Sequence, residues 1–123
     1  MGKIVMLVDD DDDVREVLRD FVEDLGYHPV VAANGQEALD TIRRLDELPC
    51  VILLDLMMPI MDGWQFLEKV GGDATLASIP VLISTSAPDR APRGQKVLAK
   101  PVDLEEFVAE LQTLCGRATG PLA

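Results

Sequence analysis

Short apolar runs alternate with amphipathic stretches along the whole chain. Residues 4–8, 50–56 and 79–85 are almost continuously apolar, as in strands buried on both faces of a sheet, and residues 28–33 and 96–102 also indicate strands. Residues 14–25, 34–45, 62–70 and 103–114 place apolar side chains at helical spacing. Because parallel neighbours require crossovers and helices must cover both faces, this alternation predicts an α/β fold with a doubly wound, five-stranded parallel sheet.

Polar residues and a glycine mark the ends of several predicted helices. Asn34 precedes the second helix with Glu37 three residues later, and Asp103 and Glu106 repeat this spacing before the last helix, as in a capping box. Gly26 stands where the first helix would end. These positions support the helix boundaries that the apolar spacing predicts.

The segment between the fourth and fifth predicted strands is short for a helical crossover. About ten residues, 86–95, separate these strands, and a crossover with a full helix needs at least ~10 to 12. Pro92 disfavours helical geometry in the residue before it, and Gly94 costs about 1 kcal/mol relative to Ala in a helix. We therefore predict no regular helix longer than about one turn, with Pro88 as the first residue of that turn.

Composition and charge exclude several classes of function. With 123 residues, 48% of them apolar, the chain is expected to form one domain over residues 1–117, with a flexible tail over residues 118–123. A net charge of −11 repels phosphate backbones and anionic lipid, and no apolar run is long enough to span a membrane. We expect a cytoplasmic protein that binds neither nucleic acid nor membranes.

Acidic residues follow two of the predicted strands. Asp9 and Asp10 follow the first strand, Asp55 ends the third, and residues 11–13 are aspartates expected to cap the first helix. In a sheet of order 2-1-3-4-5, ligands bind at the carboxyl ends of strands 1 and 3. Two carboxylates about 4 Å apart repel by roughly 4 kcal/mol at an effective dielectric constant of 20. A hard cation with oxygen ligands relieves this repulsion, so the sequence predicts an Mg²⁺ site.

A hydroxyl and an ammonium are predicted at the same edge of the sheet. Thr85 ends the fourth strand and Lys100 ends the fifth. An aspartate, a divalent cation, a lysine and a hydroxyl around one point suit phosphoryl transfer, because the cations stabilise charge on the phosphoryl oxygens while the carboxylate attacks phosphorus. Asp55 is the natural nucleophile.

Four stretches resemble the signature blocks of bacterial response-regulator receiver domains: "LVDDDDDVREVL", "ILLDLMMPIMDGWQFL", "IPVLISTSA" and "LAKPVDLEEF". The resemblance is to stand-alone receivers of the chemotaxis-regulator kind and covers nearly the whole chain. It implies a flavodoxin-like fold in a two-component system. It also implies phosphorylation of Asp55 by a histidine kinase, a histidine phosphotransfer protein or a small phosphodonor, with output through an unidentified downstream protein.

The same resemblance implies roles for the acidic residues. Asp10, Asp55 and the backbone carbonyl of Met57 are the implied ligands of Mg²⁺, and Asp9 is implied to act through water. Met57 and Ala87 occupy the two positions that tune the lifetime of the phosphoryl group in the family. Both side chains are apolar here, so neither offers a polar atom to orient attacking water.

Lys100 and Thr85 are the remaining residues with implied roles. Lys100, joined to Pro101 by a cis bond in the family, is implied to pair with the phosphoryl group, and Thr85 to hydrogen-bond it and move with it. Two features depart from the family. Most of the helix between strands 4 and 5 is missing, and Val97 replaces the aromatic residue that many receivers use as a switch. We therefore expect a monomer, because a helix that many receivers use to dimerise is absent.

The remaining reactive or unusual residues have ordinary structural interpretations. Cys50 and Cys115 lack metal-ligand spacing, and we expect them to be reduced, one in a strand and one at a helix end. His28 lies in or near the second strand, away from the acidic crevice, and we expect no role for it in phosphotransfer. The pair Met57–Met58 is expected to pack within its loop.

Two other functions remain open from the residues. The first is a pseudo-receiver, a binding module that holds a partner without phosphorylation. The second is a phosphatase, because Asp9 and Asp11 satisfy the D-x-D motif of haloacid-dehalogenase-like enzymes. Asp13 stands where those enzymes usually have a threonine, and the chain is short for a substrate cap. We expect a protein that catalyses only its own phosphorylation and dephosphorylation.

Overall fold

The structure, a computed structural model, describes residues 3–116 and contains a single five-stranded sheet with helices around it. The strands are β1 (Ile4–Val8), β2 (His28–Ala32), β3 (Val51–Asp55), β4 (Val81–Thr85) and β5 (Lys96–Ala99). The α-helices are α1 (Asp12–Asp24), α2 (Gly35–Arg44), α3 (Gly63–Gly71) and α4 (Leu104–Cys115), and two 3₁₀ turns are η1 (Leu76–Ser78) and η2 (Pro88–Arg90). The predicted tail and its boundary at residue 117 lie outside the described residues.

The sheet has the predicted strand order, β2-β1-β3-β4-β5, and each neighbouring pair is parallel. Register pairs Val8 with Leu54 and Asp55 with Ser84, so the carboxyl ends of β1, β3 and β4 are aligned. The observed strands are shorter than the apolar runs at several ends, most clearly in β5, which stops at Ala99 rather than residue 102. Lys100 therefore stands just after its strand.

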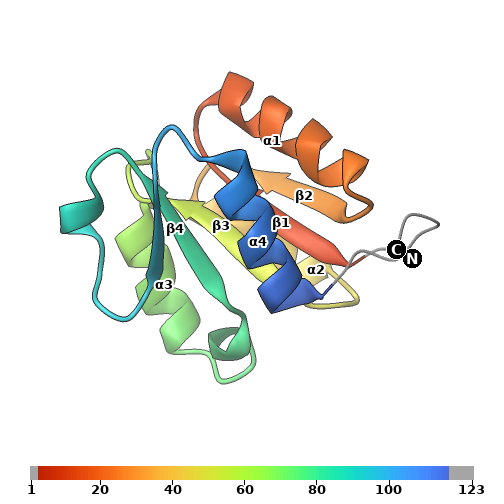
Figure 1. The fold of residues 1–123 in the computed structure, drawn as a ribbon. Helices are drawn as coiled ribbons and strands as arrows, with labels where there is room; N and C mark the ends of the chain where they lie inside the picture. The colour runs from red at the N-terminus through yellow and green to blue at the C-terminus, as the bar shows by residue number, and fades with distance from the viewer. Residues whose placement is uncertain (1–2, 117–123) are drawn as a thin grey trace.

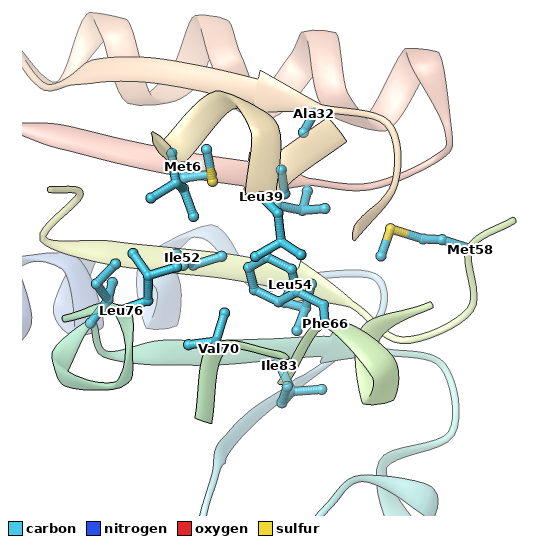
Figure 2. Close-up of a cluster of buried hydrophobic side chains, with 14 of the residues drawn as sticks. Met6, Ala32, Leu39, Ile52, Leu54, Met58, Phe66, Val70, Leu76 and Ile83 are labelled. Carbon is cyan, nitrogen blue, oxygen red and sulfur yellow. The ribbon is translucent and has the colours of Figure 1, made fainter. Parts of the chain in front are cut away.

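Helices cover both faces of the sheet, as the alternation of elements predicts (Figure 1). On one face, α1 and α4 pack through Leu18, Val22, Phe107 and Leu111. On the other, α2 and α3 bury side chains against the central strands. Figure 2 shows this second cluster, in which Leu39 of α2 and Phe66 of α3 lie over β3. The residues labelled there are Met6, Ala32, Leu39, Ile52, Leu54, Met58, Phe66, Val70, Leu76 and Ile83. None of the helices within residues 3–116 is long and apolar enough to cross a membrane.

The residues predicted as N-caps of α2 and α4 are confirmed, but neither helix has the reciprocal side-chain bond of a capping box. Asn34 accepts a hydrogen bond from the Glu37 amide at 2.9 Å, and Asp103 accepts one from the Glu106 amide at 3.1 Å. Gly26 follows α1 with φ of 96°, a left-handed conformation that glycine adopts without a steric cost. Among the described helices, both bonds of a capping box are present at α3, between Asp62 and Gln65.

The crossover from β4 to β5 confirms the prediction of a single turn. It contains η2, which begins at Pro88 and spans three residues. Ala91 and Val97 pack against the cluster beneath α2 and α3, and the Arg90 guanidinium lies 6.0 Å from the ring centroid of Trp64. This loop therefore covers part of the sheet face on which a full helix would otherwise pack.

The prediction of two reduced cysteines is wrong for this structure. Cys50 and Cys115 form a disulfide, with their Cα atoms 5.3 Å apart and a sequence separation of 65. Cys115 is the last residue of α4, as predicted, whereas Cys50 lies immediately before β3 rather than within it. Topology brings the two together, because α4 packs on the face of the sheet beside β3.

A glycine allows α3 to begin directly against the end of β3. A Cβ atom on Gly63 would lie 2.6 Å from the Asp55 carbonyl oxygen and 2.8 Å from the Leu56 Cα. Both are backbone atoms, so they cannot move aside as a flexible side chain would. The Gly63 amide also donates a hydrogen bond of 2.9 Å to the Leu56 carbonyl. Gly63 thus fixes the path of the chain after Asp55.

Gly63→Ala should lower the free energy of unfolding by about 1–3 kcal/mol, because the added methyl group overpacks a backbone contact. Gly71→Ala is the matched control in the same helix, since a Cβ there has no neighbour within 4 Å. The control should be neutral or up to about 1 kcal/mol more stable, because alanine favours helix. Urea unfolding of both variants measures the difference, and equal stabilities would contradict the close approach at Gly63.

Candidate functional site

Three aspartates meet at the carboxyl edge of the sheet, as predicted. Asp9 and Asp10 follow β1, and Asp55 is the last residue of β3. One carboxylate oxygen from each lies within 4.8 Å of the others. Asp9 and Asp55 are only 4% and 5% exposed, whereas Asp10 is exposed. The cluster therefore has a buried pair and one carboxylate open to solvent.

Asp9 is held by contacts to its backbone and to both carboxylate oxygens. Its amide donates to the Ala32 carbonyl at 3.1 Å, and its carbonyl accepts from the Arg15 guanidinium at 2.8 Å. The Asp11 amide donates to its Oδ1 at 2.9 Å, and Lys100 Nζ donates to its Oδ2 at 3.0 Å. These four bonds fix the orientation of the buried carboxylate.

Lys100 joins the two buried carboxylates. Its Nζ lies 3.0 Å from Asp9 Oδ2 and 3.4 Å from Asp55 Oδ1. Burial by itself lowers the pKa of Lys100, but the hydrogen bond and the charge of Asp9, followed by the charge of Asp55, outweigh it, so the pKa is raised. The Lys100 amide also donates to the Thr85 carbonyl at 2.9 Å, which ties the lysine to the end of β4. Lys100 is bonded to Pro101 by a cis peptide bond, in agreement with the family expectation.

The surroundings of Asp55 disfavour its charged form. Desolvation by burial and then repulsion from Asp9 raise its pKa to about 6, although Lys100 and the Met57 amide oppose the change. The Met57 amide lies 3.4 Å from Asp55 Oδ1. The free protein thus keeps a carboxylate in a position where its negative charge is unfavourable.

Thr85 lies at the predicted strand end but makes its contacts with the adjoining backbone. It is 2% exposed, and its hydroxyl oxygen accepts a hydrogen bond from the Ala87 amide at 3.1 Å. Asp55, the last residue of β3, pairs with Ser84, so Thr85 extends one position past the end of β3. Its hydroxyl hydrogen remains available for donation to an oxygen at the edge of the sheet.

The loop after Asp55 corrects one prediction. Met58 is 9% exposed and packs in the core, as expected, but Met57 is 57% exposed and does not pack within its loop. Ile60 in the same loop is 82% exposed and has φ of 70°, a conformation that a β-branched residue rarely adopts. Two apolar side chains are therefore presented to solvent close in sequence to Asp55.

The remaining acidic residues and the histidine lie where the sequence predicts. Asp11 is the N-cap of α1 and accepts from the amides of Asp13 and Val14, at 3.0 and 3.2 Å. His28 is the first residue of β2 and pairs with Ile4, at the opposite edge of the sheet from the carboxylates. Arg15, which orients Asp9, was missed because a single arginine on a helix gives no pattern in the sequence.

The arrangement suits a reaction at a carboxylate oxygen. A buried aspartate, a neighbouring ammonium and two further carboxylates that attract a cation are the groups that phosphoryl transfer requires. The edge at which they meet is where doubly wound sheets bind ligands.

Comparison with known sequences identifies the family. Residues 5–112 match the response regulator receiver domain. The chain is 37% identical over 124 residues to the response regulator Rre1 of Synechocystis sp., covering 92% of this chain and 52% of that protein. It therefore spans about half the length of that relative. It is also 30% identical to the polar-differentiation response regulator DivK of Brucella anthropi, covering 96% of this chain and 100% of that protein.

Solved structures with the same fold agree with this result. A putative response regulator from Chloroflexus aurantiacus superposes with a TM-score of 0.82 at 30% identity, covering 94% of this chain and 98% of that chain. Chemotaxis protein CheY4 of Vibrio cholerae gives a TM-score of 0.78 at 28% identity, covering 91% and 98%. The sheet order and the helices match their flavodoxin-like architecture. The chain therefore belongs to the response regulator receiver domains, which are signalling modules of two-component systems rather than classical enzymes.

Proposed function

We propose that Asp55 accepts a phosphoryl group, in an Mg²⁺-dependent reaction in the cytoplasm, from the phosphohistidine of a histidine kinase or phosphotransfer protein. The observation that supports this most is the placement of Lys100 Nζ 3.4 Å from Asp55 within the acidic cluster. Family membership supports it as well, because receiver domains interact with histidine kinases and phosphotransfer proteins. The phosphorylated domain acts through protein contacts.

The reaction forms one bond and breaks another at phosphorus. A carboxylate oxygen of Asp55 attacks the phosphorus of phosphohistidine, the nitrogen–phosphorus bond breaks, and the electron pair stays on the imidazole. Lys100 stabilises the negative charge on the phosphoryl oxygens, and the Thr85 hydroxyl donates a hydrogen bond to one of them. Hydrolysis of the acyl phosphate returns Asp55 to its starting state, so the domain acts on no substrate other than itself.

The donor set at the edge of the sheet fits Mg²⁺. Three carboxylates within 4.8 Å offer hard oxygen ligands, and the exposed Asp10 gives an ion access from solvent. Asp10, Asp55 and the Met57 backbone carbonyl would hold the ion, with Asp9 acting through water. When bound, Mg²⁺ supplies positive charge that offsets the charge on the carboxylates and on the phosphoryl oxygens.

The surface of the domain favours protein partners over nucleic acid or membranes. A net charge of −11 repels polyanions. By contrast, the exposed Met57 and Ile60 offer apolar contact area close to the phosphoacceptor in sequence. A protein that delivers a phosphoryl group to Asp55 has to approach this same edge.

A phosphorylation-independent binding module is the second candidate. The observation that favours it is the shortened β4–β5 crossover, together with Val97 in place of an aromatic switch. Both changes affect output surfaces rather than the acidic cluster. Labelling of Asp55 by a phosphodonor separates the two functions, since a binding module of this kind takes up no phosphate.

Mg²⁺ at millimolar concentration should raise the melting temperature, because binding to the folded state alone stabilises it by mass action. Asp10→Asn should abolish the shift by removing one ligand. Asp13→Asn is the matched control, because Asp13 is exposed and lies in the first turn of α1, outside the cluster. Differential scanning fluorimetry measures all three proteins. Equal responses of wild type and Asp10→Asn would argue against the metal site.

Acetyl phosphate with Mg²⁺ should add one phosphoryl group to Asp55, because this carboxylate is paired with Lys100. Intact mass spectrometry should show the adduct in wild type and in Asp46→Asn, a surface control. Asp55→Asn should show none. An adduct that persists in Asp55→Asn would place the nucleophile elsewhere, and an absence of adduct in wild type would favour the binding module.

The metal-free protein should be destabilised by Asp55 as pH rises from about 4 to about 6. The pKa of Asp55 is about 6 when folded, against an ordinary value of 3.8 for an aspartate, so in this window the folded state holds more protons than the unfolded state. Stability contributed by the protonated group is therefore lost with increasing pH. The gain in unfolding free energy from Asp55→Asn should grow over this window by on the order of 2 kcal/mol. Urea unfolding in chelator tests this, and a gain independent of pH would contradict it.

Phosphorylation should not drive dimerisation through the face that β4, β5 and α4 form. Only one short turn, η2, stands between β4 and β5, so a wall that a full helix would supply is missing. Sedimentation velocity should therefore give a monomer with and without acetyl phosphate. A monomer-to-dimer shift that is abolished by substitutions on β5 and α4 would show that the shortened crossover still supports an interface.

A further inference from the structure

The disulfide joins the two elements that position the reacting residues. Cys50 directly precedes β3, whose last residue is Asp55. Cys115 is the last residue of α4, which begins at Leu104, shortly after Lys100. Cys50 therefore lies at the end of β3 opposite to Asp55, and Cys115 lies at the end of α4 that is remote in sequence from Lys100.

β3 is tied at two places to residues 100–115, the segment that runs from Lys100 through α4. β3 has five residues and a length of roughly 17 Å, and α4 has twelve residues and a length of roughly 18 Å. At one end Lys100 Nζ lies 3.4 Å from Asp55 Oδ1, and at the other end the disulfide closes the path. The disulfide thus limits how far α4, and the segment 100–103 before it, can move relative to β3.

The end of α4 keeps its place through other contacts as well. Lys3 Nζ donates a hydrogen bond to the Cys115 carbonyl, and the Tyr27 hydroxyl donates one of 2.8 Å to the Gly116 carbonyl. Leu111, which lies four residues before Cys115 in α4, is fully buried. These contacts do not depend on the sulfur–sulfur bond, so the two cysteines remain neighbours after reduction and the bond can form again.

The two sulfur-bearing residues differ in exposure. Cys115 is 4% exposed, whereas Cys50 is half-buried and follows a loop in which Leu48 is 42% exposed. A small thiol therefore approaches from the side of Cys50. Disulfides inside cells are usually transient or redox-sensing, and the cytoplasmic location on which this point rests is part of the proposed function.

We propose that Cys50 and Cys115 form a reversible redox site, operated by a small thiol–disulfide couple such as glutathione, that sets how firmly α4 and residues 100–103 are held against β3. In the oxidised state the covalent bond holds the end of α4. In the reduced state side-chain packing and hydrogen bonds hold it alone, and its last turns open more often.

Reduction proceeds by two exchanges that balance. The thiolate of one glutathione attacks the Cys50 sulfur, the sulfur–sulfur bond breaks, and Cys115 leaves as a thiolate that takes a proton. A second glutathione thiolate attacks the glutathione sulfur of the mixed disulfide and releases Cys50 as a thiol. The protein gains two electrons and two protons, and glutathione disulfide is the product.

A redox titration tests whether the site is reversible. Wild-type protein is equilibrated in buffers of varied ratio of glutathione to glutathione disulfide, quenched in acid and alkylated with N-ethylmaleimide. Intact mass should show a two-electron transition from no adduct to two adducts, and the same curve when approached from either direction. A protein that takes up two adducts in the most oxidising buffer, or none in the most reducing one, would overturn the proposal.

Amide hydrogen exchange tests the effect on α4. In wild type, reduction should accelerate exchange at residues 111–115 at least tenfold and at the Lys100 amide at least threefold. Amides of α2, on the opposite face of the sheet, serve as the internal reference and should not change. Cys50→Ala should exchange at the faster rate in both buffers. The comparison of wild type in two buffers suffices if that variant does not fold.

Equal exchange rates at residues 111–115 and at Lys100 in the two redox states would contradict the proposal that the disulfide sets how firmly α4 is held. Neither measurement uses Mg²⁺ or a phosphodonor. Failure of the redox site is therefore distinguishable from failure of the proposed phosphorylation.

Discussion

The ammonium of Lys100 allows two carboxylates to be buried side by side. Without it, the charges of Asp9 and Asp55 would repel at a place where water cannot screen them, since both residues are almost fully buried. Several features of the fold bring these three charged side chains together. Parallel strands align their carboxyl ends, Arg15 and the Asp11 amide orient Asp9, and Gly63 lets α3 begin against the backbone of Asp55. Burial and the charge of Asp9 nevertheless raise the pKa of Asp55, so Lys100 offsets the repulsion only in part, and a bound cation would offset more of it.

Strand order and the acidic cluster were predictable because their causes are local or follow from topology. A run such as "IVMLV" is buried on both faces wherever it lies, and residues that end parallel strands share one edge. The short turn between β4 and β5 was predictable for the same reason, since Pro92 and Gly94 act on their own backbone. The strand order was predictable from the resemblance to receiver domains as well as from the alternation of strands and helices.

What the sequence did not reveal depends on contacts between distant or single residues. Cys50 and Cys115 are 65 positions apart, and their pairing follows from where α4 packs, which no spacing encodes. Met57 follows a buried strand and resembles its buried neighbour Met58, yet the turn after Asp55 directs it to solvent. Arg15 lies in a helix with many charged residues, and only the position of the Asp9 carbonyl distinguishes it from the others.

The shortened crossover and the disulfide both bear on how a change at Asp55 could reach the surface of the domain. A receiver domain has to convert a change at Asp55 into a change at its surface, and the face between β4 and β5 has little structure here to move. By contrast, α4 is a full helix that follows Lys100 by four residues and is joined to the start of β3 through Cys115. Under the proposed phosphorylation, a phosphoryl group that draws Lys100 toward itself would pull on residues 100–115, whose far end is covalently held. Given the proposed phosphorylation and the proposed redox site, the free energy of that movement would depend on whether the far end is free. By reciprocity, each state would then bias the other through α4.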